Sequence, residues 1–289
     1  MTEDNRYKPA PDLGGKLAVV TGATGGLGSA ICRSILSSGG SILMINRNRQ
    51  KSEALTAELK AQFPAAQISF LLCDLEDIRQ VKEVSSELAS LPVDILMLNA
   101  GTYAIPKARS SSGYDTVFQT NFLSHYYLVK QLLPVLQKRK TRIVATGSIA
   151  HRFNQADFSD PDFFRRKGAN EIYGNSKRFL MFALMELARE QHLDFVIGHP
   201  GISFTGITSH YPKNLLKIVR FSMQLLFMPP RKACLSMVRG IYEDVPYLHW
   251  IGPRYFDIWG PPRIKKLDTC SRQERIQIYA AAEEMCRTL

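Results

Sequence analysis

The sequence of 289 residues contains no uninterrupted apolar run of the roughly 18 residues that a membrane-spanning helix needs. Residues 1–11 are polar and lack the apolar segment of a secretory signal. The five cysteines form no pair and no CxxC spacing, so we expect reduced thiols, no disulfide framework and no metal site. No Gly/Ser-rich linker, repeat or low-complexity block interrupts the chain. These absences predict a soluble, cytoplasmic protein with one globular domain.

The formal net charge of +11 suggests an anionic partner. The basic residues are spread along the chain, and no aromatic-interleaved basic stripe or known nucleic-acid motif accompanies them. We therefore expect no nucleic-acid binding, and we attribute the positive charge to attraction of small anionic ligands.

Short apolar runs alternate with longer amphipathic stretches, a pattern typical of strands that alternate with helices. The expected strands are residues 17–21, 41–45, 67–72, 93–98, 142–145, 194–198 and 247–251. The expected helices are residues 26–38, 50–63, 76–90, 113–137, 173–192 and 271–289, with a kink or an end near Pro134. Such alternation predicts an α/β fold, a single-domain Rossmann-type doubly wound parallel sheet with helices on both faces. This domain is expected to span residues 13–251, after a polar extension (1–12) and before a less regular tail (252–289) of the same domain.

A cluster of glycines lies between the first expected strand and the first expected helix, in Thr21-Gly22-Ala23-Thr24-Gly25-Gly26-Leu27-Gly28. Glycine permits a tight turn and lets backbone amides approach a pyrophosphate, whose charge is stabilised at the helix N-terminus. A tight turn in any open α/β fold would look the same. The position directly after a buried strand favours cofactor binding.

The end of the second expected strand carries no carboxylate, although an acidic side chain at this place would bind the ribose hydroxyls of NAD. Asn46, Arg47 and Arg49 stand there instead, and the first acid is Glu53 in the next helix. Because guanidinium groups bind phosphate through charge-assisted hydrogen bonds, this pattern favours NADP(H) over NAD(H). The alternative is an ordinary basic start of a helix.

Two further turns follow the third and fourth expected strands. Asp74, which precedes Leu75, could accept a hydrogen bond from the adenine amino group, or it could cap the helix that begins near Glu76. Asn99-Ala100-Gly101 forms a small-residue turn where a cofactor could lie against the backbone.

Tyr173 and Lys177 are four residues apart and therefore share one face of an expected helix. The ordinary pKa of tyrosine is about 10, so proton transfer at neutral pH needs a perturbing neighbour. A cation at about 4 Å can stabilise the phenolate by up to roughly 4 kcal/mol, or about three pKa units, at an effective dielectric constant of about 20. This spacing also arises by chance, so the pair gains its meaning from the motifs around it.

The chain from about residue 13 to residue 251 resembles the short-chain dehydrogenase/reductase superfamily. The glycine segment is similar to its cofactor motif, and Tyr173-x-x-x-Lys177 is similar to its catalytic pair. The other similar positions are Asn99-Ala100-Gly101, Asn121 in Gln119-Thr-Asn121-Phe, Ser148 in Gly147-Ser148-Ile-Ala, and Pro200-Gly201-x-x-x-Thr205. Coincidence is an inadequate explanation for six motifs in the order of the family.

The resemblance implies an enzyme that moves hydride between NADP(H) and a carbonyl or alcohol carbon. Tyr173 would protonate the developing alkoxide, Ser148 would hydrogen-bond the substrate oxygen, and Asn121 would help to position a water of the proton relay. Lys177 would lower the pKa of Tyr173 and hold the nicotinamide ribose. The residues expected at the cofactor are Thr21, Gly22, Thr24, Gly26, Leu27, Gly28, Asn46, Arg47, Arg49, Asp74, Leu75, Asn99, Ala100, Gly101, Tyr173, Lys177, Pro200, Gly201, Ile202 and Thr205.

Within the superfamily, the inserted loop of residues 151–172 and the sequence His199-Pro-Gly resemble the retinol-dehydrogenase-like members. Gly147 departs from that pattern, since a second serine is common there, but the change removes no catalytic group. The adjacent Gly25 and Gly26 also fit the spacing of extended members, which include sugar-nucleotide epimerases and dehydratases. A non-catalytic NADP-binding sensor is a third hypothesis, against which the intact catalytic residues argue.

Residues 209–232 would form a lid over the active site in related enzymes. Their apolar residues follow an approximate helical period, and an aromatic- and methionine-rich lid favours a lipophilic carbonyl such as a retinoid, a steroid or a long-chain aldehyde. The alternatives are an interfacial helix that gives peripheral membrane contact and simple packing against the sheet.

His151 is expected in a surface or structural position, with pocket lining as the alternative, and His125 is expected to pack or cap within its helix. The resemblance also implies a homo-oligomer.

Overall fold

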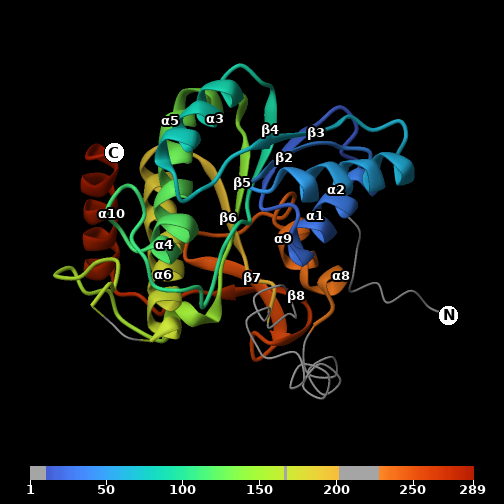
Figure 1. The fold of residues 1–289 in the computed structure, drawn as a ribbon. Coiled ribbons are helices and arrows are strands. Elements are labelled where there is room, and N and C mark those ends of the chain that lie inside the picture. The colour runs from blue at the N-terminus through green and yellow to red at the C-terminus, as the bar shows by residue number, and fades with distance from the viewer. Residues whose placement is uncertain (1–10, 166–167, 202–227) are drawn as a thin grey trace, which may run out of the picture.

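The computed structural model describes residues 11–165, 168–201 and 228–289. Its centre is an eight-stranded sheet with the order β3-β2-β1-β4-β5-β6-β7-β8, parallel throughout except for β8, which runs antiparallel to β7 (Figure 1). The strands are β1 Leu17–Thr21, β2 Ser41–Asn46, β3 Ile68–Leu72, β4 Val93–Leu98, β5 Arg142–Thr146, β6 Asp194–Gly198, β7 His249–Tyr255 and β8 Trp259–Lys266. The strand order reverses between β1 and β4, where ligands of doubly wound sheets bind.

Helices cover both faces of the sheet, as the predicted fold class requires (Figure 1). The core on one face includes α1, α2, α8 and α9, and the core on the other face includes α3, α5, α6 and α10. The described helices are α1 Gly26–Ser37, α2 Arg49–Gln62, α3 Ile78–Leu88, α4 Thr116–Phe118, a π-helical turn η1 Gln119–Leu123, α5 Ser124–Arg139, a 3-10 turn η2 Ile149–Arg152, α6 Ala169–Glu190, α8 Pro230–Ala233, α9 Leu235–Arg239 and α10 Arg272–Arg287. None of them has the length and apolar character needed to cross a bilayer.

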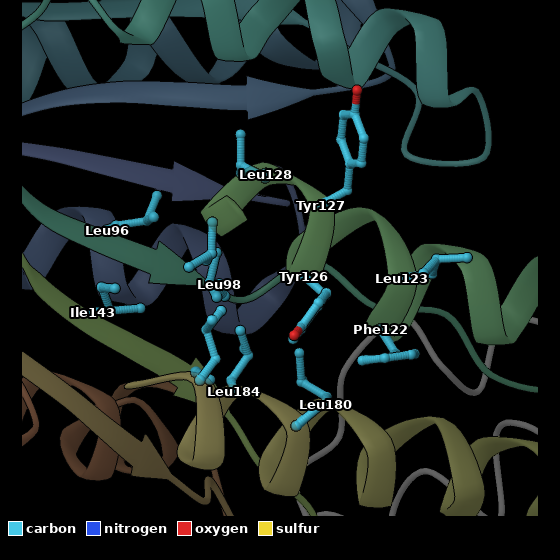
Figure 2. Packing of buried hydrophobic residues seen from close by; sticks show 14 of the residues in the cluster. Leu96, Leu98, Phe122, Leu123, Tyr126, Tyr127, Leu128, Ile143, Leu180 and Leu184 are labelled. Carbon is cyan, nitrogen blue, oxygen red and sulfur yellow. The ribbon is translucent and has the colours of Figure 1, made fainter. Parts of the chain in front are cut away.

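The core between β4, β5, α5 and α6 fixes where the helices stand over the sheet (Figure 2). Tyr126 of α5 points toward Leu180 of α6, whereas its neighbour Tyr127 points to the opposite side of α5. The rings of Phe118 and Phe122 lie 5.1 and 5.3 Å from that of Phe179 on α6, measured between ring centroids. The Phe118 ring packs edge to face on Phe179 and the Phe122 ring is tilted against it, and these directional contacts hold α4 and the π-helical turn against α6.

The structure departs from the expected elements at several places: α8 and α9 were not expected, α6 begins at Ala169 rather than at residue 173, and two longer regions differ in the following ways. The single helix expected over residues 113–137 consists of α4, η1 and α5, and α5 continues through Pro134 to Arg139. The tail expected to be irregular from residue 252 contains the end of β7 and all of β8, followed by α10. The expectation of a less regular tail was therefore wrong for residues 252–266, because residues 259–266 pair with β7, whereas the helix expected over residues 271–289 is present as α10.

Candidate active site

The glycine turn between β1 and α1 is closed on one side by the protein itself and open on the other. Gly22 has a φ of +68°, and a Cβ there would lie 2.7 Å from Cα of Ala100. A Cβ on Gly28 would lie 2.3 Å from the carbonyl oxygen of Gly22. At Gly26 the nearest described atom would be Cγ of Pro230 at 3.7 Å. Gly22 and Gly28 are therefore needed for the packing of the turn, whereas Gly26 leaves room for a pyrophosphate to approach.

The Thr21 hydroxyl ties the glycine turn to the turn after β4. Its Oγ1 accepts hydrogen bonds from the backbone amides of Asn99 and Ala100, both at 2.9 Å, and Asn99 Nδ2 donates to the Thr21 carbonyl at 3.0 Å. On the other side of the turn, the Thr24 amide donates to Oδ1 of the buried Asn46 at 3.3 Å. Three segments that the sequence showed as separate motifs therefore form one surface at the ends of β1, β2 and β4.

The two arginines after β2 are exposed and only loosely paired. Arg47 Nη1 lies 3.3 Å from Glu76 Oε1, and Arg49 Nη1 lies 3.8 Å from Glu53 Oε1. Exposed ion pairs contribute at most about 1 kcal/mol, so either guanidinium can exchange its partner for a phosphate at little cost. Glu76 is a neighbour that the sequence analysis missed, because it follows β3 rather than β2.

The segment after β3 excludes one of the two interpretations of Asp74. The helix α3 begins at Ile78, and its N-cap is Asp77, so the expectation that Asp74 caps this helix is wrong. Asp74 Oδ1 accepts a hydrogen bond from the Glu76 amide at 3.0 Å, which closes a local turn. The side chain of Leu75 is buried in the core. The contact of Asp74 with adenine stays a prediction.

Asn121 lies in the π-helical turn η1, and its amide is fully engaged. Oδ1 accepts from the Thr102 amide at 2.7 Å, while Nδ2 donates to the Thr102 carbonyl and to Ser176 Oγ, both at 3.0 Å. A Cβ on Gly101 would lie 3.3 Å from Asn121 Oδ1 and 3.6 Å from Lys177 Nζ. The turn after β4, the π-helical turn and α6 thus meet at one point.

Ser148, Tyr173 and Lys177 converge at the carboxyl end of β5. Ser148 stands two residues after the end of this strand, and its side chain interacts with Tyr173 of α6, where it acts to lower the pKa of the phenol. Lys177 is buried, and its Nζ donates to the Thr146 carbonyl at 2.9 Å while lying 5.9 Å from the centroid of the Tyr173 ring. Tyr103 packs against this ring edge to face, with centroids 5.3 Å apart. The structure therefore brings together the three residues that two separate motifs supplied.

Burial has the largest effect on the pKa values of Tyr173 and Lys177. Burial raises the pKa of Tyr173, and the hydrogen bond with Ser148 only partly opposes it. Burial also lowers the pKa of Lys177 to about 8. The spacing of the pair had suggested a lowered tyrosine pKa, whereas the folded protein keeps the phenol protonated at neutral pH. A protonated phenol is the form that can donate to a developing alkoxide.

A buried histidine that the motifs did not reveal connects Thr21 with Asn121. Nε2 of His125 lies 3.0 Å from Thr21 Oγ1, and Nδ1 lies 3.2 Å from the Asn121 carbonyl oxygen. Thr21 Oγ1 already accepts two amide hydrogens, so its own hydrogen can be donated to Nε2, which leaves the Nδ1 hydrogen for Asn121. Burial lowers the pKa of His125 to about 4, in keeping with a neutral ring.

Two more buried histidines contact the backbone around Ser148. Nδ1 of His151 lies 2.6 Å from the Ser148 carbonyl oxygen. His199 lies between the carbonyl oxygens of Gly147 at 3.3 Å and Asp257 at 2.8 Å. Burial lowers the pKa of both histidines to about 4. Of the expected positions for His151, the structure therefore shows the structural one, and the only sequence signal was its place three residues after Ser148.

The Pro200-Gly201 turn packs against the hairpin of β7 and β8. Gly201 has a φ of +79°, and a Cβ there would lie 2.6 Å from the carbonyl oxygen of Ile258. Of the expected lid, residues 209–227 lie outside the described residues, as do Ile202 and Thr205. Its remaining part contains the buried Met228 and α8, which packs against α1.

Comparison with known proteins places this arrangement in a family. The short chain dehydrogenase family matches residues 16–160, which include Ser148 and end before Tyr173. The chain is 26% identical over 264 residues to mouse polyprenol dehydrogenase, covering 87% of this chain and 78% of that protein. It is 30% identical over 214 residues to a short-chain dehydrogenase/reductase of Armillaria gallica, covering 69% of each. A solved structure from Mycobacterium paratuberculosis, 24% identical, has the same fold with a TM-score of 0.75 and covers 97% of both chains. The chain therefore belongs to the short chain dehydrogenase family of oxidoreductases.

Proposed function

We propose that this protein is an NADP(H)-dependent oxidoreductase that interconverts a carbonyl and an alcohol on a lipophilic substrate, with Tyr173 as general acid and base. The observation that carries the proposal is the convergence of Ser148, Tyr173 and Lys177, in which the buried Lys177 Nζ lies 5.9 Å from the centroid of the Tyr173 ring and the Ser148 side chain acts to lower the pKa of Tyr173. These groups stand at the same edge of the sheet as the open side of the glycine turn.

Different residues of the chain would bind the cofactor, hydrogen-bond the substrate and transfer the proton. When bound, the cofactor supplies the hydride, and the glycine turn, the Asn99–Gly101 turn and Lys177 would hold it. Ser148 donates a hydrogen bond to the substrate oxygen, and Tyr173 transfers its proton to that oxygen as negative charge develops there. The phenol of Tyr173 carries its proton at neutral pH, as a proton donor in the reduction direction must, although burial raises its pKa and so makes it a weaker acid.

The preference for NADP(H) is proposed from the residues after β2. No carboxylate ends this strand, and the Arg47 and Arg49 side chains are exposed and held by loose ion pairs. A 2′-phosphate would replace these contacts with stronger charge-assisted hydrogen bonds. Glu76 opposes this preference, because its carboxylate competes for Arg47.

The proposed substrate is a lipophilic carbonyl or alcohol such as a retinoid, a steroid or a long-chain aldehyde. Two observations support this class: the apolar and aromatic composition of residues 209–232, and the similarity to a protein named polyprenol dehydrogenase. A homo-oligomer and peripheral membrane contact through the lid belong to the same proposal, and size-exclusion chromatography and vesicle sedimentation test them.

The decisive experiment follows NADPH oxidation with a panel of lipophilic ketones and aldehydes, with NADH in parallel. We expect turnover with NADPH and a loss of about 10²–10⁴-fold in kcat for Tyr173→Phe, since this is the usual contribution of a positioned acid. Binding of NADPH to Tyr173→Phe, followed by fluorescence, should be nearly unchanged. Cofactor binding without turnover of any substrate would indicate a sensor. Conversion of a nucleotide sugar without net NADPH consumption would indicate an epimerase.

A further inference from the structure

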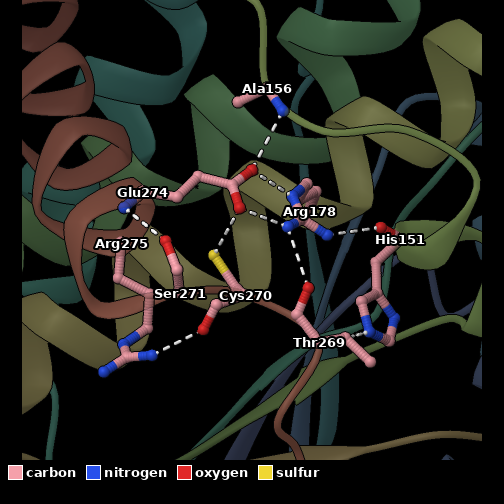
Figure 3. A network of polar contacts seen from close by, with 8 residues as sticks. All are labelled: His151, Ala156, Arg178, Thr269, Cys270, Ser271, Glu274 and Arg275. Atoms are coloured by element: carbon pink, nitrogen blue, oxygen red, sulfur yellow. Dashed lines mark hydrogen bonds and ion pairs between the residues drawn. The ribbon is translucent and has the colours of Figure 1, made fainter.

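A polar cluster outside the family motifs connects the segment after Ser148 with residues 269–275 (Figure 3). His151 stands in η2, Arg178 in α6 directly after Lys177, and Glu274 in the first turn of α10. Thr269 precedes α10 and faces the ring of His151. These four residues come from three parts of the chain: the segment after Ser148, α6, and the segment that begins α10.

His151 has one defined protonation state in this cluster. The Ser148 carbonyl oxygen, 2.6 Å from Nδ1, can only accept, so Nδ1 carries the hydrogen. Nε2 must then accept from the Thr269 hydroxyl, also at 2.6 Å. The ring is buried and packs edge to face against Trp250, with centroids 5.5 Å apart. The imidazole is thus locked in position and tautomer from both sides.

Arg178 fixes the other side of the same segment. Its Nη1 donates to the His151 carbonyl at 2.8 Å, and Nη2 donates to the Thr269 carbonyl at 3.0 Å. Nε and Nη2 bind the two carboxylate oxygens of Glu274 at 2.6 and 2.5 Å. The side chain of Arg178 is only 3% exposed and that of Glu274 14%, so a buried guanidinium binds a largely buried carboxylate through two hydrogen bonds.

Glu274 extends the cluster to the inserted loop. Its Oε1 also accepts from the Ala156 amide at 3.0 Å, and Oε2 accepts from Cys270 Sγ at 3.3 Å. The Ser271 hydroxyl caps α10 by accepting from the Glu274 amide at 3.1 Å. The start of α10 therefore places one carboxylate between α6 and the loop that follows Ser148.

We infer that His151, Arg178 and Glu274 are positioning residues that hold Ser148 in place for the reaction, so that the segment Thr269–Glu274 is part of the active site. A buried ion pair is seldom a gain in stability over apolar packing, whereas directional hydrogen bonds fix a backbone. Here both ends of the cluster bind main-chain groups of the Ser148 segment, and a misplacement of about 1 Å at a reacting group costs about 10²-fold in rate. The inference rests on the proposed oxidoreductase activity.

Two substitutions of His151 distinguish an effect on the position of Ser148 from an effect on the stability of the fold. In His151→Asn the amide can donate to Ser148 from the place of Nδ1, while the contact with Thr269 is lost. In His151→Gln the amide reaches the place of Nε2, and the bond to Ser148 is lost. We expect kcat to fall about 10–100-fold in His151→Gln and only a few-fold in His151→Asn, with KM and NADPH affinity little changed. The smaller Asn leaves the larger cavity, so a purely structural role predicts that His151→Asn is at least as damaging as His151→Gln. Equal kcat values for the two variants would therefore overturn the inference.

The pair of Arg178 and Glu274 gives a second test. Arg178→Met and Glu274→Met each leave a buried charge without its partner, so each should lower Tm and kcat. The double variant removes both charges and should regain much of the lost Tm while kcat stays low. A kcat that recovers together with Tm would show a structural role only, and would overturn the inference.

Hydrogen exchange distinguishes a failure of this inference from a failure of the proposed function. Amides of residues 148–156 in the cofactor-free protein should exchange at least several-fold faster in His151→Gln than in the unmodified protein and in His151→Asn. Faster exchange in a protein that turns over no carbonyl would refute the proposed function and leave the holding of the segment intact. Unchanged exchange in His151→Gln would refute the inference even in an active enzyme.

Discussion

Two arginine–glutamate pairs stand near opposite ends of the candidate site, and their surroundings differ sharply. Arg47 at the proposed adenosine end is 61% exposed and lies 3.3 Å from Glu76, through one nitrogen. Arg178 at the catalytic end is 3% exposed and binds Glu274 through two nitrogens. An exposed pair exchanges its partner at little cost, whereas a buried pair cannot lose one member without a large penalty. At the proposed cofactor end, Arg47 can therefore exchange Glu76 for an anion. At the catalytic end, the pair of Arg178 and Glu274 keeps its geometry.

The largest expected effect concerns buried histidines, and it is a loss of stability at low pH. His125, His151 and His199 are buried around the glycine turn and the Ser148 segment, and burial lowers the pKa of each from 6.5 to about 4. Because the unfolded chain binds protons first, the stabilisation is complete above pH 6.5 and is lost as the pH falls toward 4. We expect each histidine to cost on the order of 3 kcal/mol by pH 4, measured as the free energy of urea unfolding.

The pH dependence has a matched control. His192→Asn, a substitution at an exposed histidine, serves as the matched control for the removal of one imidazole. His151→Asn removes one titrating group and should flatten the decline in unfolding free energy between pH 6.5 and 4. A stability that does not change over this range would contradict the buried, neutral state of the three histidines.

The second effect concerns the exposed end and should appear in binding alone. Arg47→Ala removes a guanidinium from the proposed 2′-phosphate site and should weaken NADPH binding by about 1.5–3 kcal/mol, with little change for NADH. Isothermal titration with both cofactors measures this. Arg79→Ala, which removes an exposed arginine of α3, serves as the control for net charge. An equal loss for both cofactors would remove the assignment of Arg47.

The smallest expected effect distinguishes Gly26 from Gly28 in the glycine turn. Gly28→Ala places a methyl group 2.3 Å from a carbonyl oxygen and should destabilise the fold by about 1–3 kcal/mol. Gly26→Ala meets only Cγ of Pro230, at 3.7 Å among the described atoms, and should change the unfolding free energy by less than about 0.5 kcal/mol. It should nevertheless weaken NADPH binding, because the methyl group enters the open side of the turn. Tight binding by Gly26→Ala would place the pyrophosphate elsewhere.

Strand positions and the parallel fold could be predicted from the sequence because each buried strand is a local apolar run. The bounds 17–21, 93–98 and 194–198 agree with β1, β4 and β6. β8 could not be predicted in this way, since Pro261, Pro262 and several basic residues give it no apolar run, and its pairing with β7 is a tertiary contact. The π-helical turn η1 was hidden for a related reason: an extra residue in a helix leaves its composition unchanged.

The same division applies to the candidate site. Tyr173, Lys177 and the glycine turn stand in short motifs and could be read locally. The bond from His151 to Thr269 spans 118 positions, and the ion pair of Arg178 with Glu274 spans 96, so no local pattern reveals either. The lowered tyrosine pKa was expected from the charge of Lys177 alone, and it failed because spacing gives no information on burial.

The link between Ser148 and Thr269 also has a consequence for the timing of biosynthesis. A chain emerges from the ribosome N-terminus first, and its early parts begin to fold while later parts are still being made. The glycine turn and β1 to β5 precede residue 150, so the cofactor half can assemble early. The loop after Ser148 obtains its contacts with Thr269 and Glu274 only once these two residues have been synthesised, so a nascent chain would acquire the shape that binds the cofactor before the complete shape that catalyses.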